Sequence, residues 1–173
     1  MGDGQKLFDN VAPDVGAPFD LLAATEAGDE ARVASLLENG ADVNGRDERG
    51  WSPIIMAAKE GHTALLQTLI AAGASVNSPD ISHTALRGAA LFGHTDCMRM
   101  LIRAEAAVNQ CSSGGKTPLM GAAMNGHLGV LTLLLGHGAQ VDVKNDFGET
   151  ALSLAQMKGH EPLVTALSQR QYT

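Results

Sequence analysis

Apolar residues recur along this chain in short helical patterns that are separated by polar turns. Two stretches carry apolar residues at a spacing that places them on one helix face: Leu65, Leu66, Leu69 and Ile70 in the first, and Val130, Leu131, Leu134 and Leu135 in the second. Gly73 and Gly138 follow these stretches, and glycine favours a helix end because it adopts a left-handed conformation at little steric cost. The pattern predicts short helices, each too small to bury its apolar face alone.

A Gly-His pair recurs at a nearly constant interval along the chain. The copies are Gly61-His62, Gly93-His94, Gly126-His127 and Gly159-His160. Their spacings are 32, 33 and 33 residues, and an earlier copy with aspartate in place of histidine, Gly28-Asp29, lies 33 residues before Gly61. Self-similarity with such a period is typical of solenoids. We therefore predict five units that stack, so that neighbours cover each other's apolar faces.

A helix-start signature opens each of the last four units. The four copies are Ser52-Pro53-Ile54-Ile55, Thr84-Ala85-Leu86-Arg87, Thr117-Pro118-Leu119-Met120 and Thr150-Ala151-Leu152-Ser153. The Ser or Thr hydroxyl group can accept a hydrogen bond from a backbone N–H at the helix start, and proline at the next position loses no helical bond. Small pairs such as Ala57-Ala58 follow. The signature predicts a first helix of about two turns that ends at the Gly-His pair and approaches its neighbours closely.

Unit three departs from this regularity at two points. Glu105 stands where the second helices of other units end in glycine, at Gly40, Gly73 and Gly138. We expect Glu105 to carry strain, because a left-handed backbone costs a residue with a Cβ atom free energy. The loop before Thr84 is one residue shorter than its counterparts and lacks their glycine, so we expect it to differ in shape.

The signatures together resemble the ankyrin repeat, including the exit tetrad Ala41-Asp42-Val43-Asn44 and its counterparts. The resemblance covers roughly residues 17 to 170. It implies an all-α solenoid of five helix–turn–helix units joined by β-hairpin-like fingers, over residues 17–173. Arg32, Gln156 and Ser168 occupy normally apolar positions of the end units, as expected of caps with wetted outer faces. Residues 1–16 match no repeat, and we interpret them as a flexible arm.

The same resemblance implies that the chain binds another protein, as an adaptor, scaffold or inhibitor, through a concave groove and the fingertips. The positions carried over by repeat register are Arg46, Arg49, Trp51, Lys59, Glu60, Ile81, Leu91, Phe92, Lys116, Met124, Asn125, Phe147, Met157 and Lys158. The apolar stripe among them, formed by Leu91, Phe92, Met124 and Met157, indicates a binding centre on units three to five, around Phe92, Met124 and Met157. In one alternative Phe92 packs on Leu91 or a neighbouring finger, and in another the stripe is the seam of a self-associating structural module.

Asparagines at the exit tetrads are a further expectation from the resemblance. In the ankyrin family they can be hydroxylated by an oxygen-sensing dioxygenase. Asn44, Asn77 and Asn109 match that position, whereas Asp142 does not.

Charge and cysteine content limit the class of partner and the cellular compartment that we expect. The chain has 12 basic and 19 acidic side chains and a net charge of −7, which disfavours binding to nucleic acid. Its 2 cysteines, without a secretory signal, indicate a reducing compartment, so we predict a cytoplasmic location with the nucleus as the alternative. No apolar run reaches transmembrane length, and we predict no membrane insertion. We expect a monomer in the absence of a partner.

Residue types that serve in catalysis, nucleotide binding or metal binding are present, but they lack the spacing that these functions require. Gly115-Lys116-Thr117 imitates a phosphate-binding loop, but Gln110 stands where that motif needs glycine. One histidine per unit places neighbouring imidazoles ~8–10 Å apart, too far for a shared zinc ion, and we expect each to bond to the fingertip backbone. Cys97 lies at an apolar helix position, and Cys111 has no recognisable base nearby. We therefore predict a protein that is not an enzyme and that binds no cofactor or metal.

Overall fold

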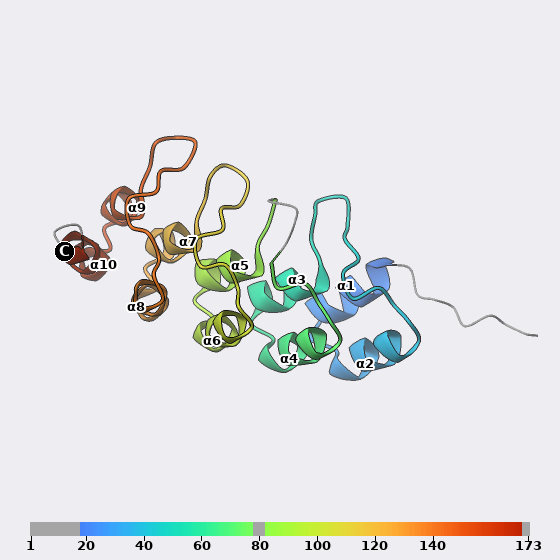
Figure 1. Cartoon of the computed structure of the whole chain (residues 1–173). Coiled ribbons are helices and arrows are strands. Elements are labelled where there is room, and N and C mark those ends of the chain that lie inside the picture. The colour runs from blue at the N-terminus through green and yellow to red at the C-terminus, as the bar shows by residue number, and fades with distance from the viewer. Residues whose placement is uncertain (1–17, 78–81, 171–173) are drawn as a thin grey trace, which may run out of the picture.

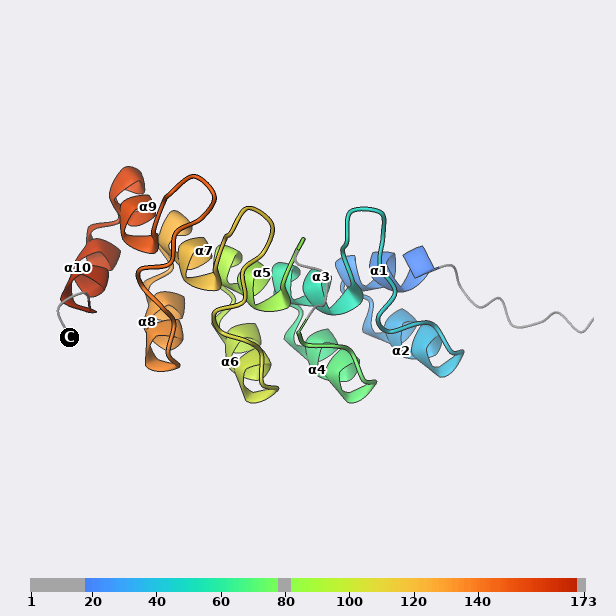
Figure 2. The same ribbon diagram turned by 45° about the horizontal axis from the view of Figure 1, so that its top comes forward.

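A two-row stack of helices makes up the computed structural model, which describes residues 18–77 and 82–170 (Figure 1). In these ranges ten helices pair into five successive units: α1 (Pro18–Glu26) with α2 (Glu30–Glu38), α3 (Pro53–Glu60) with α4 (Thr63–Ala71), α5 (Ala85–Phe92) with α6 (Thr95–Arg103), α7 (Pro118–Asn125) with α8 (Leu128–Gly136), and α9 (Ala151–Lys158) with α10 (Glu161–Arg170). The odd-numbered helices form one row and the even-numbered helices the other, and the fingers project from the odd-numbered row (Figure 2). The predicted all-α solenoid of five units is confirmed. The arm predicted over residues 1–16 lies outside the described residues.

Threonine caps begin three of the odd-numbered helices as the signature predicts. The hydroxyl oxygens of Thr84, Thr117 and Thr150 each accept a hydrogen bond from the backbone N–H three residues later, at 3.2 Å. The prediction was wrong for Ser52, whose hydroxyl group is buried and forms no such bond within the described residues. Pro53 brings no N–H group to that helix start, which reduces the number of donors that a cap would have to satisfy.

Small residues on the odd-numbered helices allow the closest packing between units. Their alanine pairs are fully buried: Ala57, Ala58, Ala89, Ala90, Ala122 and Ala123. Neighbouring odd-numbered helices approach one another more closely than neighbouring even-numbered helices, whose buried leucines need more room. At the ends of the stack Arg32 and Gln156 are exposed and Ser168 is partly exposed, as expected of caps.

The histidines of the Gly-His pairs bond to the preceding unit, so the prediction of bonds to the fingertips was wrong. The ring nitrogen Nε2 lies 2.9 to 3.3 Å from a carbonyl oxygen near the end of the preceding odd-numbered helix, in the pairs His62–Glu26, His94–Lys59, His127–Leu91 and His160–Met124. A carbonyl oxygen only accepts, so Nε2 carries the proton in each case. The reason is the position of the Gly-His pair. It follows the C-terminal end of an odd-numbered helix, whereas the finger precedes the N-terminal end of that helix.

Exit-tetrad asparagines connect each unit to the next one. The side-chain oxygen of Asn77 accepts from the Ala107 N–H at 2.7 Å, and its amide nitrogen donates to the Glu105 carbonyl at 3.0 Å. Asn44 and Asn109 form the equivalent pairs of bonds with the units that follow them. Both polar atoms of each amide therefore hold neighbouring units in register.

The fingers are hairpin-like without forming continuous strands in the described residues. Asp47 N–H donates to the Trp51 carbonyl at 3.0 Å, and Asn145 N–H donates to the Glu149 carbonyl at 2.9 Å. Ser112 and Lys116 form an isolated β-bridge at the corresponding place of the third finger. The unusual shape predicted for the finger before Thr84 falls on residues 78–81, outside the described residues.

Glu105 has the left-handed backbone that its position in the repeat predicts. Its φ is 62°, and among the described residues no other non-glycine residue has a positive φ. Glycine holds the equivalent position in other units, with φ of 85° at Gly40, 89° at Gly73 and 82° at Gly138. The Glu105 side chain is exposed, so its strain is not offset by burial.

Replacing Glu105 with glycine should raise the free energy of unfolding by about 1 kcal/mol, because glycine adopts this backbone without the Cβ clash. Chemical denaturation of the two proteins measures the difference. Glu105→Ala serves as the control, since it removes the carboxylate but keeps the Cβ atom. An equal gain from alanine, or no gain from glycine, would show that backbone strain is not the cause.

Candidate functional site

The odd-numbered helices and the fingers together form one face of the stack, which we call the inner face. Three large apolar side chains are exposed on it: Phe92 at 48%, Met157 at 64% and Phe147 at 76% of their full surface. Phe92 and Met157 lie near the ends of α5 and α9, and Phe147 lies on the last finger. Most other large apolar residues of the described chain are buried or partly buried in the core. The exposure predicted for these three side chains is therefore present.

An open hollow of about 500 Å³ crosses the C-terminal ends of α5, α7 and α9, and we call it the apolar hollow. Five predicted binding residues line it: Leu91, Phe92, Met124, Asn125 and Lys158. Three of them are apolar. Asn125 also has a structural contact, because its amide nitrogen donates to the Leu91 carbonyl at 2.6 Å. The structure thus brings together predicted residues from units three, four and five.

Phe92 lies beside a cation of the preceding unit. The Lys59 ammonium nitrogen is 5.5 Å from the centre of the Phe92 ring and 5.8 Å from the centre of the Trp51 ring. Trp51 stacks on His83 at 3.9 Å between ring centres. Lys59 also forms an ion pair with Glu60. These contacts join the first two fingers to α3 and α5, and Phe92 remains about half exposed beside them.

Trp51 is more deeply placed than the sequence indicates. The repeat register predicts it at the binding surface, but it is partly buried and packs against the core between units. The reason is that the ring lies where the finger returns to α3, between the stacked His83 ring and the body of the protein.

Polar groups shape the first finger. The Asp47 carboxylate accepts from the backbone N–H groups of Arg49 and Trp51, at 3.0 and 2.9 Å, and pairs with the Arg49 side chain at 3.0 Å. Desolvation acts to raise the pKa of Asp47, but these hydrogen bonds and the Arg49 charge outweigh it and hold the pKa below its ordinary value. Arg46 donates to the Gly50 carbonyl at 3.1 Å. Of the predicted finger residues, Ile81 lies outside the described residues.

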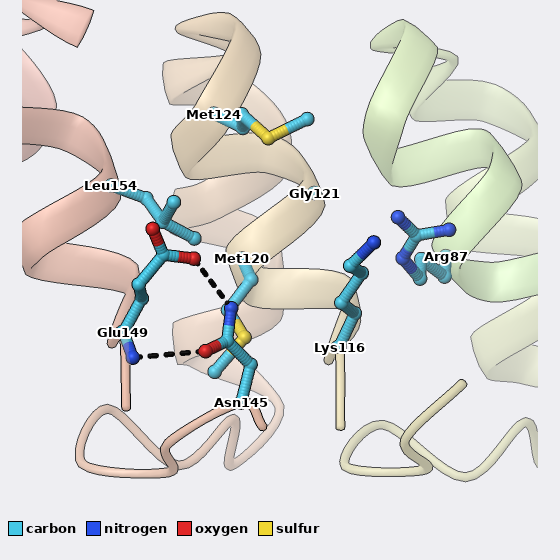
Figure 3. A pocket seen from close by; sticks show the side chains of 8 residues that line it. All are labelled: Arg87, Lys116, Met120, Gly121, Met124, Asn145, Glu149 and Leu154. Atoms are coloured by element: carbon cyan, nitrogen blue, oxygen red, sulfur yellow. Dashed lines mark hydrogen bonds between the residues drawn. The ribbon is translucent and has the colours of Figure 1, made fainter. Parts of the chain in front are cut away.

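A second, smaller cavity of about 40 Å³ lies between α5, α7, α9 and the last two fingers, and we call it the charged pocket (Figure 3). Its lining includes Lys116 and Met124, which the register predicts, together with residues that it missed: Arg87, Met120, Gly121, Asn145, Glu149 and Leu154. One signal in the sequence marks Arg87. It occupies the repeat position at which Ile55 and Met120 are buried apolar residues.

Groups with reactive chemistry are engaged elsewhere in the fold. Burial raises the pKa of the Cys97 thiol, which keeps it protonated inside the core. Cys111 is partly exposed, and its sulfur lies 3.8 Å from the Asn109 carbonyl. Within residues 18–77 and 82–170 no three metal-ligating side chains gather at one place. In the same residues no helix has the length and apolar character needed to cross a membrane.

Sequence comparisons agree with this architecture. A family model described as ankyrin repeats, in three copies, matches residues 21–111, 69–145 and 88–172. The chain is 37% identical to the E3 ubiquitin-protein ligase XBAT33 of Arabidopsis thaliana over 90 aligned residues. The aligned stretch covers 51% of this chain and 17% of that protein. It is 34% identical to ankyrin repeat domain-containing protein 37 of Mus musculus over 91 aligned residues, and this stretch covers 51% of this chain and 57% of that protein. The chain thus matches less than two thirds of the length of either relative, whereas the family model accounts for most of the chain itself. The chain belongs to the ankyrin-repeat family.

Proposed function

We propose that this chain is a non-catalytic binding module, an adaptor, scaffold or inhibitor, that holds a segment of another protein on its inner face. Ankyrin repeats are generally protein–protein interaction modules. The observation that carries the proposal is the exposure of Phe92, Met157 and Phe147 on a single face of the stack. Exposed apolar clusters usually mark interaction sites, and aromatic and methionine side chains supply anchors and adaptable contacts.

We propose that binding is centred on the apolar hollow. It lies across three successive units, so a segment bound there would contact residues that are far apart in sequence but adjacent in the stack. Lys158 at its edge and Lys59 beside Phe92 add polar contacts at the rim. An apolar centre with a polar rim is the usual anatomy of a protein interface.

The absence of catalysis is part of the proposal. Ankyrin-repeat proteins are typically non-enzymatic. The strongest candidates for catalytic groups also have structural roles here, since Cys97 is buried and four histidines bond to backbone carbonyls of the preceding unit. The net charge of −7 further favours a protein partner over nucleic acid, and a monomer in the cytoplasm or nucleus is the form we propose.

Affinity capture with the purified chain, followed by mass spectrometry, tests the proposal when it is run with paired variants. Proteins retained by the wild type should be lost with Phe92→Asp, which places a charge at the centre of the inner face. They should remain with Gln67→Ala, an exposed position on the even-numbered helix α4. Equal capture by all three proteins would contradict binding by the inner face.

Light scattering over a range of concentrations tests self-association through the same apolar residues. We expect the mass of a monomer, 17.9 kDa, at every concentration. A shift to the mass of a dimer that Phe92→Asp abolishes would instead favour the self-associating structural module.

A further inference from the structure

The charged pocket has two basic side chains on one wall and three apolar side chains elsewhere in its lining. Arg87 reaches it from α5 and Lys116 from the third finger, and in Figure 3 the Lys116 ammonium group is directed toward the Arg87 guanidinium group. Met120, Met124 and Leu154 supply apolar lining. A water molecule needs ~10–15 Å³ of such space, so the 40 Å³ cavity has room for a small polar group but not for an aromatic ring.

Neither cation forms an ion pair with another residue that the structure describes. The ion pairs there join Arg49 to Asp47 and Lys59 to Glu60, and neither involves the pocket. Glu149 lies on the opposite wall, where its carboxylate accepts from the Asn145 amide at 2.7 Å. Arg87 and Lys116 therefore share a small cavity as unpaired like charges, which repel each other.

Arg87 has a polar atom that the fold leaves without a partner. Its Nε is buried and has no hydrogen-bond acceptor within the described part of the chain. Burial also lowers the pKa of the guanidinium group, because it disfavours the charged form. The packing of neighbouring units does not require a cation at the position of Arg87, since Ile55 and Met120 are buried apolar residues at the same position of other units. Arginine at this position therefore costs the free protein stability, and an anionic ligand would offset that cost.

We propose that the charged pocket receives the side-chain carboxylate of an aspartate or glutamate from the bound segment, with Arg87 and Lys116 as its partners. The inference rests on the proposed function and gives the partner a specific chemistry. A guanidinium group offers parallel N–H donors that match a carboxylate, and an ammonium group adds a further charged donor.

Met124 relates this site to the rest of the inner face. It lines both the charged pocket and the apolar hollow, so the two cavities are adjacent. A segment seated on both would place an acidic residue at Arg87 and an apolar residue against Leu91 and Phe92. The recognised pattern is thus an acidic residue with an apolar residue close to it.

Selection from a displayed library of random dodecapeptides tests the proposal directly. Peptides selected on the wild type should share Asp or Glu at one position near an apolar residue. Changing that acid to its amide should weaken binding at least tenfold at fixed ionic strength. Arg87→Met and Lys116→Gln should cause a similar loss for the acidic peptide and little further loss for the amide peptide, which is the signature of a direct pair.

Arg99→Met is the matched control, because Arg99 is exposed on α6 and lies outside the pocket. It should bind the selected peptides as the wild type does. Arg87→Met should also melt at a higher temperature than the wild type, because it replaces a partly buried cation, whose Nε has no acceptor, with the residue type of Met120. A lower melting temperature would indicate that the guanidinium group serves the fold instead and would overturn the inference.

Two outcomes separate this inference from the proposed function. Peptides that require Phe92 but carry no acidic residue would overturn the carboxylate site and leave the binding module standing. If no selected peptide depends on Phe92, the proposal that the inner face binds peptides is wrong. NMR then tests separately whether the charged pocket binds a carboxylate. N-acetylglutamate N-methylamide should shift the Arg87 Nε–Hε resonance with saturation, and its glutamine analogue should not. Equal or absent shifts would overturn the inference.

Discussion

Replacing Phe92 with alanine should weaken partner binding at least tenfold while lowering the free energy of unfolding by less than about 1 kcal/mol. The ring is 48% exposed, and its neighbours include the Lys59 cation and the His94 ring, at 6.4 Å between ring centres. A cation–π contact at an exposed site is worth only ~0.5–1 kcal/mol. Binding would bury the ring fully, so its removal affects the complex more than the free protein.

Leu134→Ala gives the matched comparison for a core position. Leu134 is 0% exposed on α8, and its truncation should destabilise the protein by ~2–5 kcal/mol because a cavity remains. Parallel denaturation curves and titrations with the captured partner or a selected peptide measure both variants. If Phe92→Ala unfolds as easily as Leu134→Ala, the ring belongs to the core. If Phe92→Ala binds normally, the partner uses the fingers or the even-numbered helices instead.

Gly61→Ala should destabilise the protein by about 2–4 kcal/mol, for two reasons that add. The backbone at Gly61 is left-handed, with φ of 79°. A Cβ atom there would lie 2.6 Å from Nδ1 of His94, whose Nε2 bonds to the Lys59 carbonyl. The ring would have to move and would lose that bond to the preceding unit.

Gly159→Ala separates the two causes. Gly159 has φ of 71°, and a Cβ atom there would meet nothing within 4 Å. Only the backbone strain applies, so we expect a loss of about 1–2 kcal/mol. Denaturation midpoints of both variants measure the difference, and adding His94→Ala to Gly61→Ala should recover part of the larger loss. Equal losses at both glycines would refute the role of the histidine ring.

The structure gives two reasons for the glycine of the Gly-His pair. The helix end explains the glycine by its left-handed backbone, which the sequence alone predicts. The imidazole of the next unit adds a second reason, because it occupies the space that a Cβ atom would fill. Local sequence reasoning missed this contact, since the two residues lie 33 positions apart.

Local and periodic features of the fold followed from the sequence by itself. The recurring Gly-His pair predicted the five units, and the Ser or Thr starts predicted where α3, α5, α7 and α9 begin. The irregular backbone at Glu105 followed from its register. Each of these depends on a residue's own conformational preference repeated at a fixed period, so one chain contains enough information to predict it.

Tertiary structure alone decided the contacts between units. It placed the histidine bonds on the preceding unit, the Lys59 cation beside Phe92, and Arg87 in a pocket with Lys116. The register correctly assigned Leu91, Phe92 and Met124 to one surface, yet it missed Arg87, whose counterparts Ile55 and Met120 are buried and apolar. Distances between side chains of different units depend on how closely the helices stack and which rotamers they leave open. Those quantities arise only when the whole stack is assembled.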